Sequence, residues 1–144
     1  MPAYDHTYIP PAPVVDVVIL HPVRRTRSGT LRGKLDSGAD ITVVPEQVVS
    51  ALGITPKGHI WTGGYDGTYA RRALYYVRLI VEGNQVAFVR CIATDRTTVL
   101  LGRNVLNRFH VVLDGKNLRF QITLESGLEL RRGNGFGPQA LGFR

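Results

Sequence analysis

The chain has 144 residues, of which 44% are hydrophobic, a length and composition that fit one domain with a core of its own and exclude a wholly disordered chain. The single cysteine, Cys91, excludes an internal disulfide framework and a zinc site built from several cysteines. The 18 basic and 11 acidic residues give a formal net charge of +7. Because the basic residues are scattered, we expect a solvated basic surface and not nucleic acid as the main partner.

The first third of the chain is predicted to be an extended arm followed by short strands and a helix. Residues 1–13 contain four prolines and predict the arm. The β-branched run 14–20 and the alternating segment 31–35 predict two strands, and the β-branched residues 41–44 predict a third. A short helix is expected over 45–53, because proline is tolerated at a helix start and glycine commonly ends a helix.

The remainder is predicted to consist mainly of hairpins. We expect a long hairpin over 58–81 with a glycine-rich turn at 63–67, strands at 86–92 and 98–101, a short helix at 104–109 and a last hairpin over 111–122. Many short strands with two short helices predict a mostly-β barrel or sandwich.

The chain is expected to have three parts. The arm, residues 1–13, precedes a folded domain over 14–125. From Ser126 onward glycines recur and the apolar periodicity fades, so 126–144 is expected to be a basic tail.

The expected location of the protein and its lack of cofactors are inferred from sequence patterns that are absent. No apolar run approaches the roughly 20 residues that span a bilayer, and the N-terminus lacks the basic and apolar regions of a signal peptide. We therefore expect a cytoplasmic protein with no membrane span. The histidines lie far apart without metal-ligand spacing, so neither a metal nor an organic cofactor is expected; they are His6, His21, His59 and His110. Cys91, among apolar neighbours, is expected to be a buried, unreactive thiol.

Two segments carry candidate chemistry. In Lys34–Pro45 an apolar strand delivers Asp36 into a Ser-Gly-Ala turn, and a β-branched strand leaves that turn. Such a carboxylate could meet a ligand, although Asp, Ser and Gly also make an ordinary turn. In Val99–Leu106 an apolar strand runs into Gly102 and then into a short helix that carries Arg103. This segment alone is equally consistent with a capped helix after a strand.

Together and in this order, with a glycine-rich hairpin between them, the two segments resemble the retropepsin family of retroviral-type aspartic proteases. The resemblance covers roughly residues 14–124 and implies a closed β-barrel or sandwich with a flap hairpin. By this resemblance Asp36 is the catalytic aspartate, and the Ser37 hydroxyl braces the partner subunit's active-site loop. Gly38 and Ala39 form the loop backbone.

The resemblance also assigns the surroundings of the aspartate. Asp40 lies at the end of the substrate cleft and pairs with Arg103. The implied flap tip consists of Gly63, Gly64, Tyr65, Asp66 and Gly67, and the implied cleft wall of Ile41, Val99, Leu100, Leu101 and Gly102.

The function implied is aspartic endopeptidase activity, in which one carboxylate takes a proton from water and a second donates one to the scissile carbonyl. The chain holds only one Asp-Ser-Gly-Ala, since Asp66-Gly67 and Asp114-Gly115 lack the alanine. Each chain would therefore supply half a site, and we expect a homodimer with a two-fold axis between two copies of Asp36. The alternative is a module of the same fold that binds peptides or proteins with little or no turnover.

Overall fold

The computed structural model describes residues 1–63 and 66–124. The strands in these residues are β1 (Val14–Leu20), β2 (Leu31–Leu35), β3 (Thr42–Pro45), β4 (Gly58–Gly63), β5 (Tyr69–Val81), β6 (Asn84–Thr94), β7 (Val99–Leu101), β8 (His110–Asp114) and β9 (Arg119–Thr123), and the helices are α1 (Glu46–Ala51) and α2 (Arg103–Leu106). The predicted mostly-β class is confirmed, and so are the predicted strands and helices, with ends shifted by a few residues. The expected tail, 126–144, lies outside the described residues.

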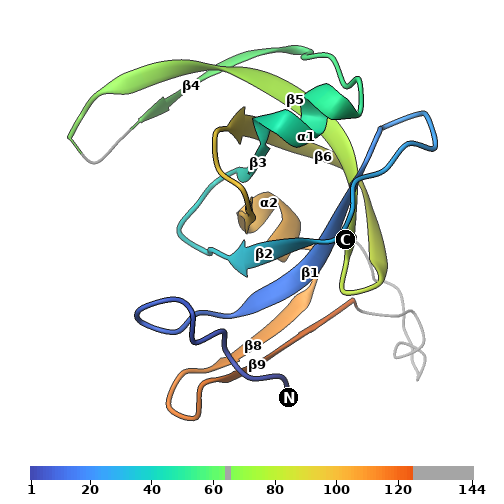
Figure 1. Ribbon diagram of the computed structural model, residues 1–144. Helices are drawn as coiled ribbons and strands as arrows, with labels where there is room; N and C mark the ends of the chain where they lie inside the picture. The colour runs from blue at the N-terminus through green and yellow to red at the C-terminus, as the bar shows by residue number, and fades with distance from the viewer. Residues whose placement is uncertain (64–65, 125–144) are drawn as a thin grey trace, which may run out of the picture.

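The strands form a mixed sheet that closes on itself. The seven-stranded sheet has the order β1-β2-β7-β3-β6-β5-β4, and β1 also pairs with β5, which closes a barrel and leaves β4 outside it. The β2–β7 and β3–β6 pairs are parallel, whereas the other pairs are antiparallel. The β4–β5 hairpin arches outward from the barrel on the same side as the loop between β2 and β3 (Figure 1).

Aliphatic side chains fill the barrel because they recur with the period of two that strands impose. In β1, Val15, Val17 and Ile19 are buried, whereas Asp16 between them is exposed. Val77 opposes them from β5 and is also fully buried. Burying one such side chain contributes about 1.5–3 kcal/mol, so this alternation is a main source of the stability of the barrel.

The β5–β6 hairpin departs from regular pairing. Its register shifts between Val77 and Leu79, and Phe88 on the opposite strand has a φ of 54°. That left-handed conformation is rare for a bulky residue and marks a bulge. Arg108 holds the bulge, because its guanidinium donates to the carbonyl oxygens of Ala87 and Phe88 at 2.5 and 3.3 Å.

The N-terminal arm is attached to the last hairpin. Ala3 pairs with Arg119 of β9, and the N–H of Tyr4 donates to the carbonyl of Leu118 at 2.9 Å. The Tyr4 ring packs beside the buried ring of Phe120, with centroids 6.1 Å apart. The arm therefore covers one edge of the β8–β9 hairpin, as its position beside β9 in Figure 1 illustrates.

Candidate active site

The central feature of the site is a tight turn that holds the Asp36 carboxylate. The N–H of Asp36 donates to the carbonyl of Leu101 at 2.9 Å, which ties the end of β2 to β7. One carboxylate oxygen of Asp36 accepts the N–H of Gly38 at 2.9 Å, and the backbone carbonyl of Asp36 accepts the N–H of Ala39 at 3.2 Å. A Cβ on Gly38 would lie 3.2 Å from that carboxylate oxygen, so glycine suits this turn. The half-buried carboxylate is thus fixed in direction.

Arg103, at the start of α2, clamps the loop from the other side. Its N–H donates to the carbonyl of Ala39 at 2.8 Å, and its guanidinium donates to the carbonyl of Ser37 at 2.8 Å. The same guanidinium forms an ion pair with the Asp40 carboxylate. The structure therefore brings together Asp40 and Arg103, and it gives Arg103 a second role in holding the backbone of the Asp36 loop.

A buried threonine connects the loop to the helix and to β6. The hydroxyl of Thr42, which is fully buried, accepts the N–H of Gly102 at 3.1 Å and donates to the side-chain oxygen of Asn104 at 2.9 Å. That oxygen also accepts the N–H of Thr42 at 3.1 Å, and the amide nitrogen of Asn104 donates to the carbonyl of Arg90 at 2.7 Å.

Sequence reasoning missed the roles of Thr42 and Asn104. The available signals were a lone polar residue within the β-branched run 41–44 and an asparagine directly after Gly102-Arg103. Neither signal shows that the two residues meet, because they lie 62 positions apart in the chain.

Gly102 lies where two backbones cross. A Cβ at this position would come within 2.6 and 2.7 Å of the carbonyl carbon and oxygen of Ile41, and within 3.0 Å of the carbonyl oxygen of Ala39. Only glycine allows the end of β7 to approach the Asp36 loop this closely. The residue predicted as part of the cleft wall therefore acts as the crossing point beneath the loop.

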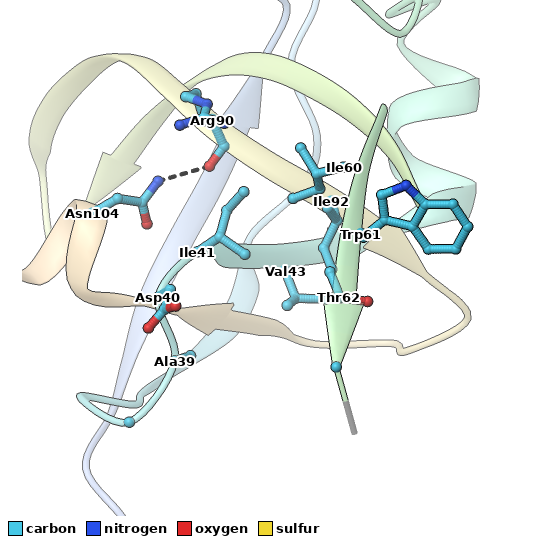
Figure 2. A pocket seen from close by; sticks show the side chains of 12 residues that line it. Ala39, Asp40, Ile41, Val43, Ile60, Trp61, Thr62, Arg90, Ile92 and Asn104 are labelled. Carbon is cyan, nitrogen blue, oxygen red and sulfur yellow. Dashed lines mark hydrogen bonds between the residues drawn. The ribbon is translucent and has the colours of Figure 1, made fainter. Parts of the chain in front are cut away.

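A pocket of about 560 Å³ lies between the Asp36 loop and β4 (Figure 2). In this view Asp40 and Asn104 lie on one side, and Trp61 and Thr62 lie on the other. Polar and apolar groups contribute to its surface in similar measure, and the full lining is Gly38, Ala39, Asp40, Ile41, Val43, Ile60, Trp61, Thr62, Gly63, Arg90, Ile92 and Asn104. The pocket could hold part of an extended peptide, since pockets of this size that combine apolar side chains with polar groups bind such ligands.

Most residues of the predicted cleft wall do not line this pocket. Val99 and Leu101 are fully buried, because these alternate residues of β7 lie on the strand face that packs in the core of the barrel. Leu100 is half-buried. Only Ile41 of the predicted wall residues contributes to the pocket. The rest of the lining comes from the Asp36 loop, from β3, β4 and β6, and from Asn104 of α2.

The predicted flap tip is only partly described, since Gly64 and Tyr65 lie outside the described residues. Gly63 lines the pocket. The Asp66 carboxylate accepts the hydroxyl and the N–H of Thr68 at 2.7 and 3.1 Å, and these bonds lower the pKa of Asp66. With Gly67 at a φ of 81°, Asp66 forms a local turn.

Within the described residues, no cationic side chain forms a hydrogen bond or an ion pair with the Asp36 carboxylate. Lys34 lies on β2, two residues before Asp36, but its ammonium lies 5.5 Å from the ring centroid of Tyr8. In the same residues no group of three or more His, Cys, Asp or Glu side chains is placed to hold a metal ion. No helix of residues 1–63 and 66–124 is long and apolar enough to cross a membrane.

Cys91 on β6 is free and buried, and burial raises the pKa of its thiol to about 12. Because only the thiolate is alkylated at an appreciable rate, we expect iodoacetamide at mildly alkaline pH to react at least about a hundredfold more slowly with the folded protein than with the denatured protein. Mass spectrometry of the alkylated chain checks this. Equal rates in the two states would contradict the burial of Cys91.

The closed mixed barrel, with an aspartate loop that crosses the start of a short helix, is a retropepsin-like fold, the fold of the retroviral-type aspartic proteases. Among solved structures, the chain is similar to the Simian Foamy Virus (mac) protease, determined in solution, with a TM-score of 0.51 and 22% identity over 65% of this chain and 91% of that one. It is also similar to the foamy viral protease-reverse transcriptase in complex with an RNA/DNA hybrid, with a TM-score of 0.50 and 19% identity over 65% of this chain and 11% of that one. No protein-family model and no curated protein matches the sequence. At these identities the similarity shows the fold alone.

Proposed function

We propose that this protein is an aspartic endopeptidase that works as a homodimer. The observation that carries the proposal is the Asp36 turn, in which one carboxylate oxygen accepts the Gly38 N–H at 2.9 Å and the loop backbone is clamped by Arg103. A catalytic carboxylate needs such a fixed direction, because proton transfer requires the acid or base within hydrogen-bond reach of the reacting group. The adjacent pocket, with both apolar and polar lining residues, offers a place for substrate.

The chemistry requires two carboxylates, and each chain supplies one. Two carboxylates in contact share one proton, because both cannot be ionised cheaply. The ionised Asp36 takes a proton from water as the water oxygen attacks the scissile carbonyl carbon. The protonated Asp36 of the second copy donates its proton to the carbonyl oxygen, which gives a tetrahedral diol. The C–N bond then breaks as the first Asp36 passes its proton to the amide nitrogen and the second Asp36 takes a proton from a diol hydroxyl, which leaves a carboxyl group and an amine and restores the single shared proton.

The second copy is proposed to bind against the surface beside Ser37 and along β8. Val112 and Leu113 of β8 are 49% and 53% exposed, and β8 pairs on one edge only, with β9, within the described residues. A groove of about 470 Å³ next to this strand is lined by Leu35, Ser37, Arg103, Leu106, Asn107, Phe109, Val111 and Leu113. Exposed apolar residues on a strand with one unpaired edge are typical of an interface.

Ser37 provides a test of this arrangement. Its carbonyl accepts Arg103, but its hydroxyl makes no hydrogen bond within the described residues of one chain, and the residue is exposed. If the hydroxyl bonds across the dimer, Ser37→Ala is expected to weaken dimerisation by about tenfold, since each dimer loses two bonds worth about 1 kcal/mol or less. Sedimentation of a dilution series measures this, with Ser37→Thr as the variant that keeps the hydroxyl. An unchanged dissociation constant would argue against the brace.

The activity itself is tested with a mixed peptide library, scanned from about pH 3 to about pH 8 so that carboxylate titration is covered. The wild type and Asp36→Asn are compared side by side. We expect cleavage by the wild type alone, with apolar residues beside the cut, because Ile41, Val43 and Ile92 line the pocket. A folded dimer that cleaves nothing at any pH would overturn the proposal in favour of a peptide-binding module.

A further inference from the structure

A second cavity, of about 480 Å³, lies away from the Asp36 loop. It is bounded by the segment after β1, the segment before β4, and β5 and β6, and its lining is His21, Pro22, Val23, Ile54, Thr55, Lys57, Tyr76 and Phe88. None of these residues lines the pocket beside Asp36. Figure 1 shows the loop after β1 on the opposite side of the barrel from the loop between β2 and β3. We call this cavity the anchor pocket.

One wall of the anchor pocket is a loop held by specific hydrogen bonds. The Nδ1 atom of His21 accepts the N–H groups of Val23 and Arg24 at 3.0 and 2.9 Å. The guanidinium of Arg78 donates to the carbonyls of His21 and Arg24 at 3.0 and 2.9 Å. The loop is therefore fixed from within and from β5, and yet it leaves the Val23 side chain 85% exposed.

The opposite wall of the anchor pocket carries Phe88, another exposed apolar residue on a backbone that is held by hydrogen bonds. Its left-handed backbone, at a φ of 54°, is held by the guanidinium of Arg108 on the carbonyls of Ala87 and Phe88. The ring is nevertheless 80% exposed. A strained conformation that presents a large apolar side chain to water costs free energy and contributes no core packing, so it points to a role in binding.

The surroundings of the anchor pocket are cationic. Lys57 lines it, Arg24 is part of its loop, and the Arg78 guanidinium holds that loop. The pKa of His21 is lowered, first by desolvation and then by the positive charges of Arg24, Arg78 and Lys57. No ion pair to any of these three cations occurs within the described residues. A ligand here would meet apolar side chains at the centre and uncompensated positive charge at the rim.

We propose that the anchor pocket is a docking site for an acidic peptide segment that carries an aromatic or aliphatic anchor residue. The anchor would pack between Val23 and Phe88, and flanking carboxylates would meet Lys57 and Arg24. Charge complementarity selects this occupant, because a second copy of this chain would bring a net charge of +7 to a surface that is already positive. The docking does not depend on hydrolysis, and it would give the protein a contact with partners outside the pocket beside Asp36.

Binding is tested by fluorescence anisotropy with a labelled peptide, Glu-Asp-Leu-Phe-Asp-Glu, and the full chain carrying Asp36→Asn, so that the probe is not consumed. Two matched peptides replace either the acidic residues by lysine or the Leu-Phe pair by alanine. We expect the first peptide to bind at least about tenfold more tightly than either of the others, with affinity that falls as salt is added.

Variants locate the site. Phe88→Asn removes the ring but suits the left-handed backbone, and it is expected to weaken binding about tenfold or more. Lys57→Glu is expected to weaken binding about fivefold at low salt, whereas the control Arg96→Glu, at an exposed position outside the anchor pocket, leaves it unchanged. Trp61→Ala, which removes an exposed aromatic residue from the pocket beside Asp36, is also expected to have no effect.

Three results would overturn the proposal. The first is equal binding of the acidic and the lysine peptides, which would remove the charge complementarity. The second is loss of binding in Trp61→Ala but not in Phe88→Asn, which would place the peptide in the pocket beside Asp36. The third is self-association of the chain that Phe88→Asn abolishes, which would identify a second copy as the occupant.

Discussion

Replacing Asp36 by asparagine is expected to abolish peptide hydrolysis while the fold and the dimer persist. The amide can neither take a proton from water nor donate one as a carboxylic acid does, so the rate should fall by about three orders of magnitude or more. The amide oxygen can still accept the Gly38 N–H that the carboxylate accepts at 2.9 Å. In a dimer, the substitution also removes repulsion between two carboxylates, so thermal stability should be unchanged or higher.

The measurement pairs peptide cleavage with thermal unfolding of the same preparations. Asp16→Asn is a matched control, because Asp16 lies on β1, is exposed and forms only a surface ion pair with Arg32 at 2.8 Å. Such pairs contribute little, so this variant should keep both its activity and its stability. If Asp36→Asn cleaved peptides as fast as the wild type, the hydrolysis would not come from this site.

Local sequence patterns predicted the strands well because each strand is half-buried or fully buried and carries its own signal. The alternation in 31–35 and the β-branched runs at 14–20 and 41–44 each correspond to a strand. The Asp36 turn was also predictable, since the two bonds that shape it, from the N–H groups of Gly38 and Ala39 to Asp36, are local. Its bonds to Leu101 and Arg103 join distant parts of the chain and gave no local signal. Its chemistry could be inferred only by resemblance, because an Asp-Ser-Gly sequence also makes ordinary turns.

Features that depend on distant residues were not predicted. The apolar run 99–101 suggested a cleft wall, but its alternate residues Val99 and Leu101 face the core of the closed barrel and are completely buried. The bulge at Phe88 shifts the alternation, so that Val86 and Val89 are buried and Ala87 and Phe88 between them are exposed. Because all four residues are apolar, the sequence gives no sign of this shift. The anchor pocket depends on this bulge, and so it could be recognised only in three dimensions.

Replacing Gly102 by alanine is expected to have the largest effect on stability. The new Cβ would lie 2.6 and 2.7 Å from the Ile41 carbonyl atoms and 3.0 Å from the Ala39 carbonyl oxygen. All three are backbone atoms, which cannot move aside as a flexible side chain can. The two backbone segments must separate. This should lower the free energy of unfolding, measured by urea denaturation, by about 3 kcal/mol.

Gly115→Ala is the matched control, because a Cβ there would meet nothing within 4 Å. Its effect on unfolding should be within about 0.5 kcal/mol, as for most exposed positions. If Gly102→Ala were as stable as Gly115→Ala, the added Cβ would have to lie farther from the Ile41 carbonyl carbon than the expected 2.6 Å, and so the two backbone segments would lie farther apart.

The crossing at Gly102 also links stability to the proposed catalysis. On either side of it, the Asp36 N–H bonds to the Leu101 carbonyl at 2.9 Å and the Arg103 N–H bonds to the Ala39 carbonyl at 2.8 Å. Separating the backbones by a few tenths of an ångström lengthens both bonds and turns the Asp36 carboxylate. Gly102→Ala should therefore lose activity even at temperatures at which it remains folded, because a small misplacement of a catalytic group can cost about a hundredfold in rate. Full activity in the folded variant would show that the direction of Asp36 does not depend on this crossing.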